Sequence, residues 1–112
     1  MPEKDLEITE VPGGNGERLL RLNGPLLLSN FFPFQKLVRE DQSPSLVIDM
    51  TDVPYIDSAG IGALVGVHVH RQRDGRALLL VGVTDRVRTS LQLTKVDTLF
   101  KFGEATAGRS SA

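Results

Sequence analysis

The sequence predicts an α/β fold, in which helices pack on a sheet with parallel crossovers, and three features support this prediction. A segment with period-two alternation near the N-terminus precedes turn residues and a second apolar segment, as in a β-hairpin. Beyond the hairpin, segments with helical spacing alternate with short continuous apolar runs typical of buried strands. Helices and strands in alternation require parallel crossovers with helices against the sheet.

The hairpin is the first predicted unit. Residues 6–11 alternate apolar and polar side chains, residues 12–16 supply turn residues, and residues 19–22 form the second strand. Residues 23–25, Asn-Gly-Pro, end that strand.

The first helix is predicted from apolar side chains at helical spacing, Phe31, Phe34, Leu37 and Val38. Ser29 or Asn30 can cap it, and Pro33 fits only in its first turn. Residues 45–49 form a compact apolar run, which we place at the centre of the sheet.

Residues 59–73 fit two descriptions. Their valines alternate as in a strand. Other residues recur at helical spacing and would share one face of a helix: Ile61, Leu64, Val65, His68 and Gln72. Length and context favour the helix.

The C-terminal part continues the alternation. Residues 77–83 form another apolar strand, and Thr84 or Asp85 caps a helix that carries Val87, Leu91 and Leu93. A last short strand is expected at residues 98–102, and residues 103–112 are expected to form a flexible tail.

The composition fits one domain, residues 1–112, with its core in residues 5–102. The chain has 112 residues and 40% hydrophobic content, enough for one core. Its 13 basic and 14 acidic residues give a formal net charge of -1, which disfavours nucleic acid and anionic membranes as partners. The absence of cysteine rules out thiolate metal sites, and no apolar run is long enough to cross a bilayer, so we expect a cytoplasmic protein.

The candidate chemistry is concentrated in residues 49–62, where an apolar strand runs through a polar loop into a glycine-rich helix start. Ser58 follows Asp57 and precedes small residues, so we predict that Ser58 is the helix N-cap. A phosphate on Ser58 would meet backbone N–H groups and the positive end of the helix dipole. The residues alone therefore leave three roles open for Ser58: a cap, a nucleophile or a phosphate acceptor.

A dinucleotide-binding fold is one alternative, because Gly60, Gly62 and Gly66 form a G-x-G-x-x-x-G spacing. Eight residues, Thr51 to Ser58, separate the strand from these glycines, whereas the phosphate turn of that fold is tight. Glycines that let a helix approach the sheet or a partner explain the pattern better.

A hydrolase is a second alternative, with Ser58 as nucleophile. Residue 56 is Ile where the G-x-S-x-G elbow needs Gly. The only histidines, His68 and His70, lie on the following helix, where catalytic triads rarely take their base.

Metal binding is disfavoured as well. On a helix His68 and His70 point about 200° apart, so they are expected to be packing or surface residues. A divalent cation could bind Asp49, Asp52 and Asp57, but loop and cap carboxylates are favoured there. We therefore predict no metal and no cofactor.

Residues 46–100 resemble the STAS domain, the family of bacterial anti-sigma factor antagonists. The strand that ends at Asp49 is similar to the central strand of the family, and Val53–Ile61 is similar to its signature D-S-[ST]-G-hydrophobic. Similar later segments are Leu80-Val81-Gly82-Val83, Val87-Arg88, Leu91-Gln92-Leu93-Thr94 and Leu99-Phe100. The resemblance implies a mixed sheet of about five strands with helices mainly on one face.

The resemblance also implies a function. Ser58 corresponds to the phosphate acceptor, because Asp57, Ser58 and Gly60 match the signature. Such proteins are non-catalytic: they bind an anti-sigma factor serine kinase when unphosphorylated and are released when that kinase phosphorylates them, and a PP2C-type phosphatase restores them. The partner-binding residues implied here are Asp57, Ser58, Ala59, Gly60, Ile61, Gly62 and Leu27.

The chain departs from the family pattern at two places. Ala59 replaces the second small hydroxyl residue of the signature, and the loop after Gly24 reads Pro-Leu-Leu-Leu where the family often has an acidic residue. This apolar loop is either core or a hydrophobic docking surface. Two other functions stay open: a STAS-type scaffold without phosphorylation in a signalling or transport complex, and a small nucleotide-binding or hydrolytic enzyme.

Overall fold

The computed structural model describes residues 5–12 and 16–104, and its elements follow the predicted alternation of strand and helix. The strands are β1 (Glu7–Pro12), β2 (Glu17–Asn23), β3 (Ser45–Asp52), β4 (Ala77–Val81) and β5 (Phe102–Gly103). The helices are α1 (Phe32–Glu40), α2 (Ser58–Arg73), α3 (Asp85–Leu93) and the short 3-10 helix η1 (Asp97–Leu99).

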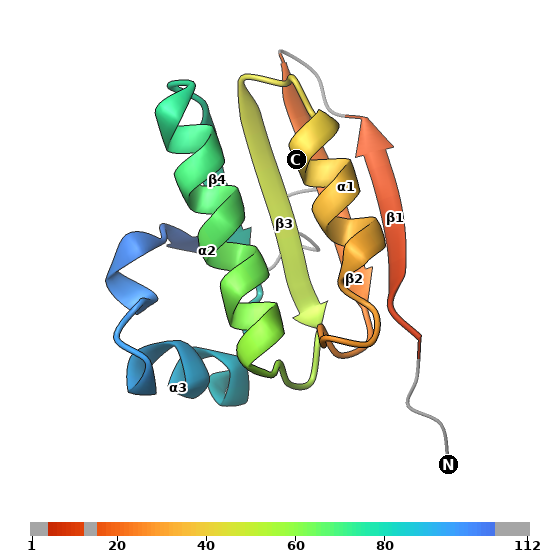
Figure 1. Ribbon diagram of the computed structural model, residues 1–112. Helices are drawn as coiled ribbons and strands as arrows, with labels where there is room; N and C mark the ends of the chain where they lie inside the picture. The colour runs from red at the N-terminus through yellow and green to blue at the C-terminus, as the bar shows by residue number, and fades with distance from the viewer. Residues whose placement is uncertain (1–4, 13–15, 105–112) are drawn as a thin grey trace.

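The sheet has the order β1-β2-β3-β4-β5, so the strands lie side by side in chain order with β3 at the centre. The β1–β2 pair is antiparallel and the other pairs are parallel. Crossovers that advance in one direction with the usual right-handed sense leave their helices on the same face. Figure 1 shows α1 and α2 side by side against one face of the sheet. The predicted α/β fold with helices mainly on one face is confirmed.

The core lies between this face and the helices. From the sheet, Leu22, Ile48 and Leu80 are fully buried, and Phe34 of α1 and Leu64 of α2 pack in the same cluster.

The helical description of residues 59–73 is confirmed, since α2 spans Ser58–Arg73. The predicted apolar face is wrong in part: Leu64 is buried, but Gln72 is exposed. The helix buries Ala63, Val67 and Arg71 instead. None of the described helices is long and apolar enough to span a membrane.

The predicted start of α1 is wrong by one or two residues. The helix begins at Phe32, without a side-chain cap, and Pro33 lies in its first turn as expected. Asn30 does not cap the helix, because its side chain accepts a hydrogen bond from Leu27 N at 2.9 Å and donates one to the Pro25 carbonyl at 2.9 Å. Asn30 therefore stabilises the preceding loop.

The C-terminal elements also differ in detail. Thr84 caps α3 as predicted, through Val87 N at 3.3 Å. However, β4 ends at Val81, since Gly82 adopts a positive φ of 66°. The strand predicted at 98–102 is wrong, since residues 97–99 form η1 and only residues 102–103 pair with β4. The predicted tail lies mostly outside the described residues.

Candidate functional site

The loop between β3 and α2 brings the predicted site to the carboxyl end of the central strand. Val53 is fully buried and Ile56 is 8% exposed, so these two side chains fix the loop to the core. Ser58 then begins α2 at an exposed position. Open α/β sheets usually place binding sites at this edge.

Asp57, not Ser58, is the N-cap of α2, which corrects the sequence prediction. The Asp57 backbone is extended, and its Oδ1 accepts a hydrogen bond from Gly60 N at 2.9 Å. Its Oδ2 accepts a second hydrogen bond from Leu28 N at 3.1 Å. A carboxylate can satisfy donors from two chain segments at once through its two oxygens, which explains why Asp57 takes the cap position.

The loop between β2 and α1 lies directly against this helix start. Leu26 pairs with Ile56 in an isolated parallel bridge, in which Leu26 N donates to the Tyr55 carbonyl and Asp57 N donates to the Leu26 carbonyl, each at 3.3 Å. A Cβ on Gly60 would lie 2.3 Å from the Leu26 carbonyl oxygen. Only glycine permits this approach, so Gly60 is a packing residue.

Ser58 is the first residue of α2 and is accessible. Within the described ranges no residue holds its hydroxyl in a hydrogen bond. The histidines lie 10 and 12 residues farther along the helix, hence about 15 to 18 Å away along its axis. Asp57 is occupied by backbone donors. The geometry thus presents a hydroxyl that a kinase can phosphorylate. None of the described residues is placed as a general base that would activate this hydroxyl for catalysis by the protein itself.

The other predicted partner-binding residues fall into two groups. Gly62 is exposed, and Ala59 and Ile61 are partly exposed, so these three lie on the surface beside Ser58. Gly60 is buried under the Leu26 carbonyl and cannot be read directly by a partner.

Leu27 was predicted on the partner-binding surface, but it is only 5% exposed. In this part of the chain, the exposed apolar side chains are Leu28, which is 65% exposed, and Phe32, which is 64% exposed. The apolar loop is therefore partly core and partly surface. Sequence patterns missed Leu28 because a loop has no period to indicate direction; the turn held by Asn30 decides which leucine faces outward. Phe32 is the first residue of α1 and lies outside the apolar face predicted for that helix.

The carboxylates considered for a metal have other partners. The Asp49 carboxylate accepts hydrogen bonds from Thr51 Oγ1 at 2.6 Å and Thr51 N at 2.9 Å, and Arg21 Nε lies 3.4 Å away. Asp57 bonds backbone N–H groups. Among residues 5–12 and 16–104, no three His, Cys, Asp or Glu side chains form a group that could hold a metal ion. The cap role that the sequence favoured is confirmed for Asp57, whereas Asp49 lies within β3, where its carboxylate bonds Thr51.

The sheet order argues against the dinucleotide alternative as well. Strands in simple chain order offer no point at which the order reverses, and dinucleotide-binding sheets bind their ligand at such a point. Gly60 serves close packing, as the sequence favoured, whereas a Cβ added to Gly62 or Gly66 would meet nothing within 4 Å.

Comparisons with known proteins agree with the fold and identify the family. The STAS domain model matches residues 7–108. Among curated proteins, the anti-sigma-B factor antagonists of several Staphylococcus aureus strains are 28% identical over 69 residues. That match covers 62% of this chain and 64% of the relative, slightly less than two thirds of its length.

Solved structures share the fold. An anti-sigma factor antagonist from Mycobacterium paratuberculosis superposes with a TM-score of 0.75 at 17% identity, over 88% of this chain and 85% of that chain. The Bacillus protein SpoIIAA in its phosphorylated form gives 0.73 at 13% identity, over 94% and 96%. The murine anion transporter Slc26a9 gives 0.72 at 15% identity, over 90% of this chain and 21% of that one. With a family model that matches nearly its whole length, this chain belongs to the STAS domain family.

Proposed function

We propose that this protein is an anti-sigma factor antagonist controlled by phosphorylation of Ser58. Unphosphorylated, it binds an anti-sigma serine kinase in the cytoplasm and frees a sigma factor for transcription. Phosphorylation by that kinase releases it, and a PP2C-type phosphatase restores the binding form. The protein itself is non-catalytic. Its family and the names of its Staphylococcus aureus relatives support the proposal.

The observation that carries the proposal is the exposed Ser58 hydroxyl at the first position of α2, next to a cap that does not use it. Phosphorylation adds about -1.5 to -2 charges. A helix N-terminus stabilises such an anion by about 0.3 to 2 kcal/mol, so the free domain accommodates it.

The same phosphate acts differently in a complex. Leu28, whose backbone N–H bonds Asp57, is 65% exposed, so an apolar side chain lies on the surface near Ser58 and favours an apolar partner surface. An unmatched charge buried in an interface costs about 2 to 5 kcal/mol, roughly 30-fold to several thousand-fold in affinity. This cost exceeds the stabilisation by the helix, so phosphorylation drives dissociation.

A phosphorylation assay tests the proposal directly. The full chain is incubated with the cognate kinase and ATP, and the modified peptide is identified by mass spectrometry. We expect phosphate at Ser58, none in Ser58→Ala, and unchanged labelling in Ser29→Ala, which removes an exposed serine of the adjacent loop. Phosphate at another residue, or at none, contradicts the proposal.

A second candidate function is a STAS scaffold that works without phosphorylation. The exposed Leu28 and Phe32 favour it, because an apolar surface can hold a partner permanently. In that case Leu28→Ser with Phe32→Ser abolishes binding of a co-purified partner, whereas Ser58→Glu leaves it intact. Loss of binding in both variants supports the phosphorylation switch instead.

A further inference from the structure

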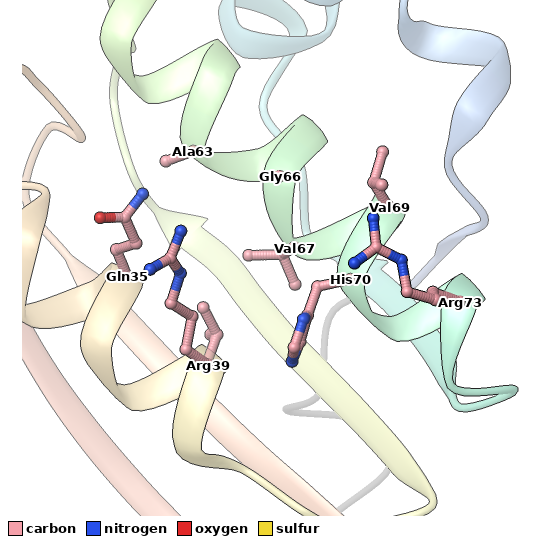
Figure 2. Close-up of a pocket in the computed structure, with 9 residues that line it drawn as sticks. Gln35, Arg39, Ala63, Gly66, Val67, Val69, His70 and Arg73 are labelled. Carbon is pink, nitrogen blue, oxygen red and sulfur yellow. The ribbon is translucent and has the colours of Figure 1, made fainter.

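The groove between α1 and α2 is a second surface, distinct from the Ser58 site. It has a volume of about 490 Å³. Figure 2 shows Gln35 and Arg39 extending from α1, and Val67 and His70 from α2, into the space between the two helices.

The floor of the groove is apolar and buried, and the exposed apolar surface lies beside it on α2. Val38, Ala63 and Val67 form it where the two helices pack. Gly66 is exposed, and a Cβ added there would meet nothing within 4 Å. Val69 of the lining is 45% exposed. Apolar area is therefore available along one side of α2.

The charged side chains of the groove all have one sign. These are Arg39 and Arg73, which lie beside the polar His70, and no acidic residue lines the groove. Among the ion pairs of the described residues, none involves these three side chains, whereas Arg71 and Arg76 are paired with Asp41 and Asp74. Positive charge without an internal partner thus flanks an apolar floor.

We propose that this groove binds an acidic amphipathic helix of a partner protein, with apolar side chains on the floor and carboxylates on Arg39 and Arg73. From Ala63 to Arg73 the groove is about 15 Å long, the length of a helix of roughly three turns. Placing a helix in a groove is a common mode of peptide recognition. Residues 105–112 of this chain do not suit the groove, since they include an arginine and no acidic residue.

Binding in the groove is independent of phosphorylation. Although the groove begins at Ala63, about 8 Å from Ser58, its charged residue on α2, Arg73, is 15 residues from Ser58, about 22 Å along the helix axis. This separation exceeds the Debye length of about 8 Å at physiological salt. A partner held in the groove therefore stays bound when phosphorylation releases a partner from the Ser58 surface.

Two synthetic helical peptides of 14 residues test the inference on the full chain. Both carry leucine at positions i, i+3, i+4 and i+7, and the remaining flank positions are glutamate in one and lysine in the other. We expect the glutamate peptide to bind about tenfold more tightly in fluorescence anisotropy, and more weakly as salt is added. Its NMR chemical-shift changes should centre on residues 35–39 and 63–73. Equal binding of both peptides, no binding, or shift changes centred on residues 26–32 and 57–62 overturns the inference.

Variants separate the groove from its surroundings. Gly66→Leu fills the groove without a clash, and we expect at least tenfold weaker binding of the glutamate peptide. Gln72→Leu adds the same side chain to an exposed position of α2 outside the groove, and should bind normally. The double variant Arg39→Glu, Arg73→Glu should also bind the glutamate peptide at least tenfold more weakly. Unchanged binding in the Gly66 and arginine variants contradicts the inference.

The phosphorylated chain distinguishes this inference from the proposed function. We expect Ser58-phosphorylated protein to bind the glutamate peptide within twofold of the unmodified protein. A larger loss contradicts an independent groove, and the kinase assay above decides the Ser58 proposal separately.

Discussion

Asp57 and Gly60 are the residues that shape the site around Ser58. The Asp57 carboxylate joins the start of α2 to the β2–α1 loop, and Gly60 lets the Leu26 carbonyl approach the helix. The sequence placed the helix start one residue late, because it assigned the cap to Ser58. Asp and Ser are both good caps, and the choice depends on Leu28 N, 29 positions away in the chain, which no local pattern reveals.

Asp57→Ala removes both hydrogen bonds of the cap. We expect the free energy of unfolding to fall by about 1 to 2 kcal/mol, since a lost cap typically costs about 1 kcal/mol and a second hydrogen bond adds a similar amount. The free energy of unfolding of Asp57→Asn should lie between those of Asp57→Ala and wild type, because the asparagine side chain keeps one oxygen acceptor. Urea unfolding measures the difference, with exposed Asp52→Ala as the control. An Asp57→Ala value equal to that of the control contradicts the assigned role.

Gly60→Ala and Gly62→Ala form a matched pair on one helix. The added methyl of Gly60→Ala collides with the Leu26 carbonyl, whereas that of Gly62→Ala enters open space. We expect Gly60→Ala to destabilise the protein by about 1 to 3 kcal/mol and Gly62→Ala to stabilise it by up to about 1 kcal/mol. Thermal unfolding of both variants checks the opposite signs, and shifts in the same direction would refute the packing role of Gly60.

At the scale of elements, α2 is fixed at both ends. Asp57 holds its start, and near its end Arg71, only 1% exposed, donates to Asp41 Oδ2 at 3.0 Å, to the Ser43 carbonyl at 2.7 Å and to the Ala77 carbonyl at 2.9 Å. The sequence did not predict this anchor, because a basic helix end usually indicates a solvated face. The 3-10 helix η1 was missed for a similar reason, since the apolar residues around Leu99 resemble a short strand.

The Asp41–Arg71 pair makes stability depend on pH. Burial by itself would raise the pKa of Asp41, but the Ser43 hydroxyl, Arg18 and Arg71 outweigh burial and hold that pKa below its usual value of 3.8. A carboxyl whose pKa is lower in the folded state contributes stability above pH 3.8, and this contribution is lost as the pH falls through the folded-state pKa. Wild type should therefore lose stability in this acid range.

Asp41→Asn tests this anchor. It leaves the Arg71 charge buried without its carboxylate, so we expect a loss of about 3 to 5 kcal/mol at pH 7. The variant should also lose less stability than wild type between pH 5 and pH 2, where Asp41 no longer titrates, although other carboxyls still do. Urea unfolding at several pH values measures both effects. Parallel pH profiles for the two proteins would exclude Asp41 as the source.

At the scale of the whole molecule, the strand order determines where the functional surfaces lie. Strands in chain order with crossovers in one direction place α1 and α2 on one face, with Ser58 at the carboxyl end of the sheet (Figure 1). This architecture was predictable, because the central strand is continuously apolar and strands and helices alternate along the chain. Only residues 59–73 had an ambiguous period, which length and context resolved in favour of a helix. The exposure of Leu28 and the groove beside His70 were not, because both arise from contacts between segments distant in the sequence.

The most direct test of the central claim is the affinity of the cognate anti-sigma kinase for this protein before and after phosphorylation of Ser58. Isothermal titration calorimetry with the two purified forms measures both values under identical conditions. We expect phosphorylation to weaken binding of the kinase by at least about 30-fold, because burying an unmatched charge in the interface costs roughly 2 kcal/mol of binding free energy. Equal affinities for the two forms would contradict the central claim.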